Sequence, residues 1–326
     1  MKKLFLLALL CTILLTGCRD YNELNMQDIV SHAGVDYSDG EVSVCVVCEG
    51  GKEEKPKVLK SSGKSFFEAV RNFSGSSDKK LYWGHIQTIV FGEEALRFVF
   101  DDTLDAILRA RDVYHDVIPV AVKENAESAL TATADSSSGN IFEIFANSEN
   151  SRRFEGVPLW ELMRERELSH VCVIPTAEKS EDGYIMSGGA VLSEKGVLGY
   201  LSEEQCLFRS LLTDKSAGGY LPVIELEKDR AVSFEILAND VKIKREGERI
   251  IINESITLSP AEVRGDFDEK EMREVASEYL ARAYRDFIAT SKEKGFGNIL
   301  NIHGADENSE IEVSVDVKIT SVMGGA

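Results

Sequence analysis

The sequence predicts a mixed α+β fold of three small domains, in which the last domain is an antiparallel or mixed sheet packed against one long helix. Three observations support this prediction. Short apolar runs with strand periodicity recur along the whole chain. Helix-periodic segments alternate with them in the first half, as in α/β units. The last third combines strand-like runs, a long amphipathic segment over 266–294 and a strictly alternating run over 311–319.

Residues 18–180 are expected to form an N-terminal α/β domain. Asp39-Gly40 marks a turn that joins two strand-like runs. Pro119 cannot donate a ladder hydrogen bond, so the strand that contains it is expected near a sheet edge. In chain order, the strands are expected over 42–48, 58–60, 81–91, 117–122 and 171–174. The helices are expected over 65–73, 92–108, 141–146 and 159–167.

Residues 181–230 are expected to form a middle domain. Runs over 184–192 and 196–201 predict a hairpin. Ser202 and Gln205 match a capping box, which predicts a helix to about residue 212. A short strand over 223–226 follows.

Residues 231–326 are expected to form the C-terminal domain, in which strands precede and follow the long helix. Its first three strands are expected over 232–236, 241–244 and 250–258. The two domain boundaries are placed in polar segments, 178–183 and 227–230.

The composition excludes some classes of partner. The chain of 326 residues carries 37 Lys+Arg and 56 Asp+Glu, a net charge of -19. An acidic chain lacks the basic face that nucleic-acid binding requires, so no nucleic-acid partner is expected. The same net charge argues against electrostatic docking to anionic lipid.

The first 17 residues have the layout of a secretory signal peptide. Two lysines precede twelve apolar residues, Leu4 to Leu15, which are too few to span a membrane. The following Leu15-Thr16-Gly17-Cys18 resembles the lipobox of bacterial lipoproteins, in which the cysteine is acylated with diacylglycerol and the chain is cut just before it. The resemblance implies cleavage between Gly17 and Cys18 and lipid attachment at Cys18. The mature chain would then have a net charge of -21, because the signal segment removes two lysines.

Four further cysteines follow Cys18, and the sequence leaves their roles open because they permit three disulfide pairings. Cys45 and Cys48 form a CxxC within a predicted strand, where residues three apart point to opposite faces. A shared metal or a redox pair is therefore disfavoured, and burial as small apolar side chains is favoured for Cys45, Cys48, Cys172 and Cys206.

No pattern of catalytic or metal-binding residues stands out. The histidines are scattered singly, without HExxH spacing: His32, His85, His115, His170 and His303. No nucleophile and base share a motif, so no enzymatic activity, cofactor or metal is expected.

Several stretches resemble the spore germination GerC-type lipoproteins. The family's C-W-D-R-R-E-L-N and following G-x-D are echoed by Cys18-Arg19-Asp20-Tyr21-Asn22-Glu23-Leu24-Asn25 and Gly34-Val35-Asp36. Its R-x-L-Y-x-G-H strand and G-E-E-x-A helix start are echoed by Lys80-Leu81-Tyr82-Trp83-Gly84-His85 and Gly92-Glu93-Glu94-Ala95. A later R-D pair and an apolar hairpin are echoed by Arg111-Asp112, Gly189-Ala190-Val191-Leu192 and Val197-Leu198-Gly199-Tyr200-Leu201. Departures include Arg19, where the family usually has Trp.

The resemblance implies a function and a location. Family members are non-enzymatic lipoprotein subunits of nutrient germinant receptors in spore-forming bacteria, built from three mixed α/β domains. They lie on the outer face of the inner spore membrane beside two integral-membrane subunits. The resemblance therefore implies membrane attachment through a diacylglyceryl cysteine at position 18, and His85 is interpreted as a packing and hydrogen-bonding residue inside a strand.

Two alternatives stay open on the sequence. A solute-binding lipoprotein of a transporter also has a lipobox, but such proteins usually have two doubly wound lobes. The antiparallel pattern of the last third disfavours that class. A secreted, anchored hydrolase would need a catalytic constellation that the sequence does not display.

Overall fold

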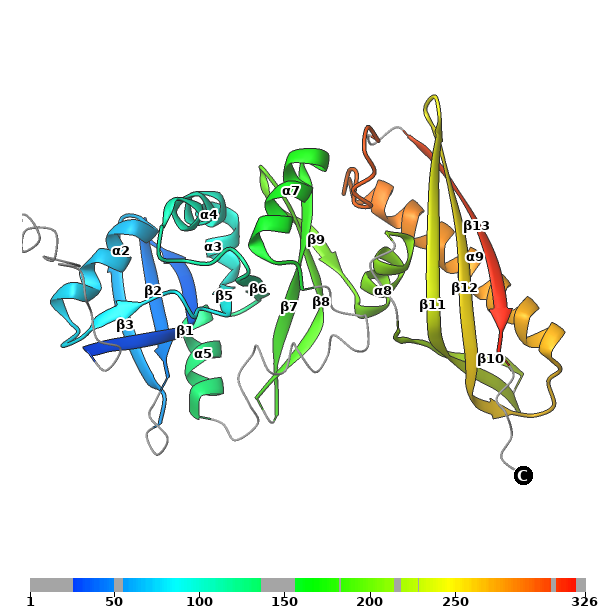
Figure 1. Ribbon diagram of the computed structural model, residues 1–326, viewed down its shortest axis with the longest axis horizontal. Helices are drawn as coiled ribbons and strands as arrows, with labels where there is room; N and C mark the ends of the chain where they lie inside the picture. The colour runs from blue at the N-terminus through cyan, green and yellow to red at the C-terminus, as the bar shows by residue number, and fades with distance from the viewer. Residues whose placement is uncertain are drawn as a thin grey trace, which may run out of the picture.

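The described residues of the computed structural model are 26–49, 55–135, 156–181, 183–213, 218–227, 229–305 and 309–320. They form a mixed α+β fold, as predicted, and their elements follow one another in three groups along the long axis (Figure 1). The N-terminal group lies at one end, a hairpin-based middle group lies between, and the C-terminal group holds a separate sheet with one long helix.

One large sheet spans the N-terminal and middle groups, in the order β3-β2-β1-β5-β6-β7-β8-β9, with β4 paired to β1. Its outer strands pair antiparallel, whereas β1, β5, β6 and β7 run parallel. The strands are β1 (Gln27–Ser38), β2 (Glu41–Cys48), β3 (Lys57–Gly63), β4 (Lys80–Tyr82), β5 (Thr88–Phe91), β6 (Ile118–Val122), β7 (Val171–Ser180), β8 (Gly183–Ser193) and β9 (Gly196–Leu201).

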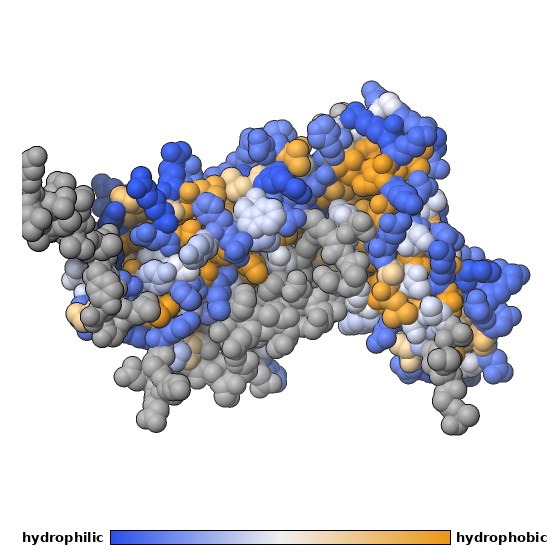
Figure 2. Space-filling model, in the orientation of Figure 1, coloured by the Kyte–Doolittle hydropathy of each residue, from blue (hydrophilic) through white to orange (hydrophobic). Residues whose placement is uncertain are grey.

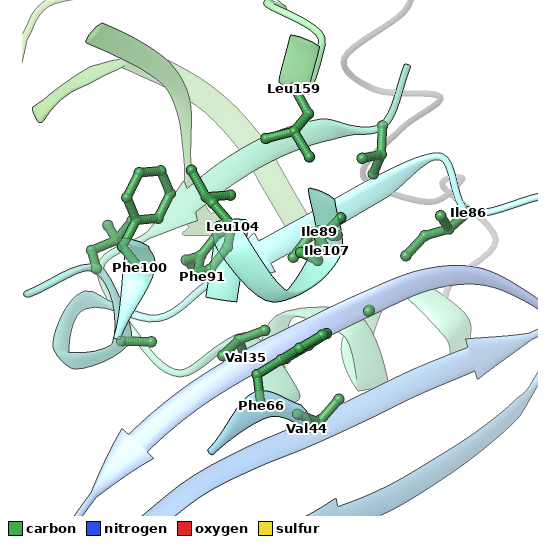
Figure 3. Close-up of a cluster of buried hydrophobic side chains, with 14 of the residues drawn as sticks. Val35, Val44, Phe66, Ile86, Ile89, Phe91, Phe100, Leu104, Ile107 and Leu159 are labelled. Atoms are coloured by element: carbon green, nitrogen blue, oxygen red, sulfur yellow. The ribbon is translucent and has the colours of Figure 1, made fainter. Parts of the chain in front are cut away.

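Helices cover both faces of this sheet. One face packs on α2 (Phe66–Asn72), α3 (Glu93–Phe98), α4 (Phe100–Arg109) and α7 (Leu159–Ser169), and the other packs on α5 (Ala126–Asp135). Figure 3 shows part of the first core, where Ile107 of α4 lies beside Ile89 of β5, and Phe66 lies beside Val35 and Val44. Because both faces are covered, the central strands are apolar on both sides.

The turn at Asp39-Gly40 forms as predicted. Both residues have positive φ, 53° and 82°, as the central residues of a type I′ hairpin turn require. The capping box also forms: the Ser202 hydroxyl accepts from the Gln205 N–H, and the Gln205 side chain accepts from the Ser202 N–H, at the start of α8 (Glu203–Leu212).

The strand expected over 81–91 is broken into β4 and β5, which corrects the prediction. The Ile86 N–H donates to the Trp83 carbonyl at 3.2 Å and closes a turn between them. Gly84 lies against the ring of Tyr82, and a Cβ at position 84 would lie 2.5 Å from the Tyr82 hydroxyl. The mostly apolar segment therefore forms two strands joined by a partly exposed turn.

The strand that contains Pro119 is central, not near an edge. Strand β6 lies between β5 and β7. The Ile118 N–H points to β5, where it bonds the Gln87 carbonyl, so the Pro119 nitrogen faces β7. Strand β7 pairs only with Ala121 and Val122, so no ladder hydrogen bond is lost at Pro119.

The helix expected over 92–108 is interrupted once. Val99 has φ -133° and ψ 7°, outside the helical region, and separates α3 from α4. The predicted apolar stripe is otherwise buried, with Leu96, Phe100, Leu104 and Ile107 in the core.

The C-terminal group is a four-stranded sheet with α9 (Glu269–Glu293) packed on one face, as predicted. Asp268 caps this helix by accepting from the Glu271 N–H at 2.7 Å. The strands, in spatial order, are β10 (Tyr220–Glu227), β11 (Arg230–Glu246), β12 (Arg249–Arg264) and β13 (Glu310–Ile319). The two strands expected over 232–236 and 241–244 form one continuous β11, which bulges between Ile236 and Ala238.

Both sequence-based domain boundaries fall at hairpin turns. Strands β7 and β8 pair down to Ser180 and Gly183, and β10 and β11 pair down to Glu227 and Arg230. A division after residue 180 or 230 would therefore cut through a paired hairpin. The chain changes sheets between β9 and β10, around α8, and the middle group in Figure 1 begins with α7.

Candidate functional site

A groove of about 520 Å³ opens between α2, β4 and the C-terminal end of α4. This volume falls within the range of ligand-binding clefts. Four core residues labelled in Figure 3 also line it: Phe66, Ile86, Ile89 and Ile107. The half-buried Trp83 completes the apolar wall and packs edge-on against Phe66, with 6.5 Å between the ring centroids.

The charged side chains that line the groove are nearly all cationic. A single acid, Asp112, stands against five exposed bases, in a chain whose acids outnumber its bases. The cations come from α2, from the strand β4 with the residue before it, and from the end of α4 with the loop after it: Arg71, Lys79, Lys80, Arg109 and Arg111.

Local ion pairing leaves part of this positive charge uncompensated. Arg109 pairs with Asp105 one turn earlier at 2.7 Å, and Lys79 lies 3.9 Å from Asp28. Within the described part of the chain, Lys80 and Arg111 form no ion pair. The groove therefore combines an apolar floor with a positive rim. Such an arrangement suits an anionic ligand that also has apolar groups.

The groove lies where the described chain begins. Strand β4 pairs in parallel with the start of β1, which places Lys80 opposite Gln27. Figure 2 shows apolar patches between polar side chains over the α2 and α4 region. The first described strand and the positive rim are thus side by side.

A family model described as the spore germination protein N-terminal domain matches residues 20–179, a range that contains the whole groove. The chain belongs to the GerC-type spore germination proteins. This membership gives the protein a role in spore germination, as a receptor subunit that is associated with the membrane.

The fold also matches a crystal structure of the GerBC protein, with a TM-score of 0.59 and 14% sequence identity. The match covers 93% of this chain and 100% of that chain. At this identity the likeness concerns the fold. A search of the curated proteins found no match.

Several residues that carry the GerC-type resemblance hold the fold together. The Asp36 carboxylate accepts from the backbone N–H groups of Ala126 and Glu127, at 2.7 and 3.0 Å, at the start of α5. These N–H groups have no partner within the helix, so Asp36 satisfies them from β1. A Cβ at Gly92 would lie 2.2 Å from the Asp36 carboxylate, which explains a glycine there.

The histidine of the GerC-type signature is exposed. His85 lies in the turn between β4 and β5, outside the strand that was expected to contain it, with its ring centroid 5.7 Å from that of Tyr82. The buried histidine is His32, which lies 2.8 Å from the Thr88 hydroxyl through Nδ1. Burial lowers the pKa of His32 to about 4, so it is neutral at pH 7.

The four cysteines within the described fold are buried, and none of the four is joined in a disulfide. Cys45 and Cys48 lie on opposite faces of β2, in two different apolar cores, as the strand period predicted. Burial raises the pKa of the Cys45, Cys48 and Cys172 thiols to about 12, 11 and 12. Within the described residues, no group of three or more potential ligands is placed to hold a metal.

The predicted lipid attachment site, Cys18, and the cleavage position after Gly17 lie outside the described residues, as does the helix expected over 141–146. Among the described helices, none has the length and apolar character needed to cross a membrane.

Sequence reasoning did not find the groove, although it singled out two stretches that line it. Both the Leu81–Trp83 run and the Arg111-Asp112 pair were recognised from their resemblance alone. The stretch 71–111 holds six bases and six acids, so no local excess of positive charge in the sequence marks the groove; only the fold separates these bases from the acids.

Proposed function

We propose that this protein is a lipid-anchored, non-enzymatic subunit of a spore germinant receptor. It is needed for the germination response to nutrients and acts through contacts with two integral-membrane receptor subunits. The family match over residues 20–179 carries the proposal, because that family is one of germination proteins. No nucleic acid takes part.

The anchor is proposed at Cys18, on the extracytoplasmic face of the inner spore membrane. The signal segment and the Leu15-Thr16-Gly17-Cys18 motif support it. Each buried acyl methylene contributes about 0.8 kcal/mol of membrane binding, so two acyl chains suffice for stable attachment. Palmitate is proposed as an acyl group of this anchor, so radiolabelled palmitate should be incorporated at Cys18.

Replacement of Cys18 tests the anchor, and the chain offers a matched control. Cys18→Ala should abolish incorporation of radiolabelled palmitate and release the protein from the membrane fraction. Cys11→Ala, within the signal segment, should leave both unchanged. Retention of the Cys18→Ala protein in the membrane fraction would overturn the lipid anchor.

Deletion of the gene tests the receptor role. Spores should form normally but lose germination with particular nutrients, and the wild-type gene should restore it. Normal germination with every nutrient would contradict the receptor role. Calorimetric binding of a transported solute to the purified chain would instead support a solute-binding lipoprotein.

A further inference from the structure

We propose that the groove between α2 and α4 binds the headgroup of an anionic phospholipid and so seats the N-terminal group on the membrane surface. The proposal rests on the proposed lipid anchor, which would keep the groove near the bilayer. The net charge of the whole chain argues against binding to anionic lipid, whereas the local charge of the groove favours it.

Charge complementarity is the first argument. The groove lining carries five bases and one acid, whereas the whole chain carries 37 bases and 56 acids. Lys80 and Arg111 have no ion pair with any described residue, so both can meet a phosphate without giving up a protein partner. Arg71 keeps its guanidinium 5.2 Å from the centroid of the Phe67 ring, which holds the cation beside an apolar surface.

The exposed apolar residues beside these cations are the second argument. Phe67 of α2 is 62% exposed and Met26, just ahead of β1, is 64% exposed. Free phosphate, a hydrated anion, would gain no favourable contact with these apolar side chains. A bilayer surface offers both an anionic headgroup layer and an apolar layer beneath it, which amphipathic protein surfaces contact together. Phe67 and the groove wall would face the acyl layer while the bases meet the headgroups.

The length of the tether is the third argument. Eight residues separate Cys18 from Gln27, and Gln27 pairs with Lys80 at the groove edge. Fully extended, this segment spans roughly 30 Å, so a chain anchored at Cys18 keeps Lys80 within that distance of the lipid. A soluble protein partner has no comparable constraint that would bring it to the groove, and the integral-membrane subunits, which the bilayer also holds nearby, are distinguished by co-reconstitution.

Trp83 gives a direct test, because it lines the groove and the chain has only two tryptophans. In the lipidated mature chain, Trp160→Phe leaves Trp83 as the sole indole. This protein is reconstituted in phosphatidylcholine vesicles with or without phosphatidylglycerol, using lipids brominated on their acyl chains. We expect the bromines to quench Trp83 strongly in the presence of phosphatidylglycerol and weakly without it, and salt to reverse the effect.

Charge variants connect the quenching to the groove. Neutralising Lys80 and Arg111 with Lys80→Gln and Arg111→Gln should raise the phosphatidylglycerol content needed for half-maximal quenching, with about a fivefold loss of affinity for each lost charge. Lys270→Gln with Arg273→Gln, exposed on α9, should change nothing. Far-UV circular dichroism should be the same for all these proteins, because the substituted side chains are exposed.

Three results would overturn the proposal. The first is equal quenching of Trp83 in both kinds of vesicle, and the second is unchanged quenching in the Lys80 and Arg111 variants. The third is a change in Trp83 fluorescence that occurs only when the integral-membrane receptor subunits are co-reconstituted. The last result would identify a protein as the occupant. Failure of the anchor is distinguishable, because it abolishes flotation with vesicles of phosphatidylcholine alone. Vesicles added to the unlipidated chain would then still test whether quenching depends on phosphatidylglycerol.

Discussion

Arg209 of α8 and Glu165 of α7 form a buried ion pair, with 3.2 Å between the guanidinium Nη2 and the carboxylate Oε2. Their side chains are 0% and 4% exposed. Arg209 Nε also donates to the Ile299 carbonyl at 2.9 Å, in the segment that follows α9. One buried cation thus links α7, α8 and the segment after α9, and so joins the middle group to the C-terminal group.

Removing the cation should destabilise the protein strongly. Arg209→Met removes the cation that pairs with the buried Glu165 carboxylate and the donor to the Ile299 carbonyl, which should lower the free energy of unfolding by about 3–5 kcal/mol. Urea denaturation followed by circular dichroism measures the loss. The control is Arg97→Met, which breaks an exposed pair with Glu93 and should cost less than about 1 kcal/mol.

Replacing both partners of the buried pair should recover most of that loss. Glu165→Leu combined with Arg209→Met removes both buried charges and keeps apolar volume at the junction. A double variant that is no more stable than Arg209→Met would contradict this account. It would indicate that the hydrogen bond to Ile299, not the ion pair, holds the junction.

Glu254 should make stability depend on pH. It lies on β12 in the core beneath α9 and accepts from the Tyr284 hydroxyl at 2.8 Å. Burial raises its pKa from 4.5 to about 7, so the folded state keeps a proton that the unfolded state releases. The protonated carboxyl contributes its full stabilisation below about pH 4.5. As the pH rises to about 7 this contribution is lost, which lowers the free energy of unfolding by on the order of 3 kcal/mol.

The matched variants for this prediction are Glu254→Gln and Glu262→Gln. Glu254→Gln should flatten the decline in unfolding free energy between pH 4.5 and 7, because glutamine does not titrate. Glu262 is exposed on the same strand, so its replacement should leave the pH dependence unchanged. Equal slopes for wild type and Glu254→Gln would contradict the assignment.

Asp36 should stabilise α5 through its two hydrogen bonds. Asp36→Ala leaves the N–H groups of Ala126 and Glu127 without this acceptor, and should cost about 1–2 kcal/mol of unfolding free energy. Asp36→Asn keeps one acceptor oxygen and should cost less. Thermal unfolding of both variants measures the order, and equal losses would argue against the hydrogen-bonding role.

The four buried thiols should be unreactive until the chain unfolds. Thiol reagents attack the thiolate, and burial raises the pKa of Cys45, Cys48 and Cys172 well above 9. At pH 8 we expect labelling of the lipidated chain on the order of 100-fold slower in buffer than in urea. Rapid labelling of the CxxC pair in buffer would instead support a redox role.

The sequence predicted the elements whose signals are local. The Asp39-Gly40 turn, the capping box at Ser202 and the long helix α9 each depend on residues within a few positions of one another. The alternation over 311–319 likewise places Val317 in the core, because a strand turns every second side chain to the same face.

Predictions that depended on distant partners were less accurate. Pro119 indicated an edge, yet β6 is central because β7 pairs beyond the proline. The polar turns at 180 and 230 indicated boundaries, yet each closes a hairpin, since the same turn residues serve linkers and paired strands.

By itself, the sequence determined the mixed class of the fold, the local turns and caps, and the resemblance that led to the family. Only the tertiary structure decided which strands pair across long separations, and which charges gather at one place. The net charge of -19 averages over the whole chain, whereas α2, β4 and the end of α4 bring bases from 71 to 111 around one apolar groove. Charge and periodicity are properties of the chain, but a site depends on contacts between segments that the chain order keeps apart.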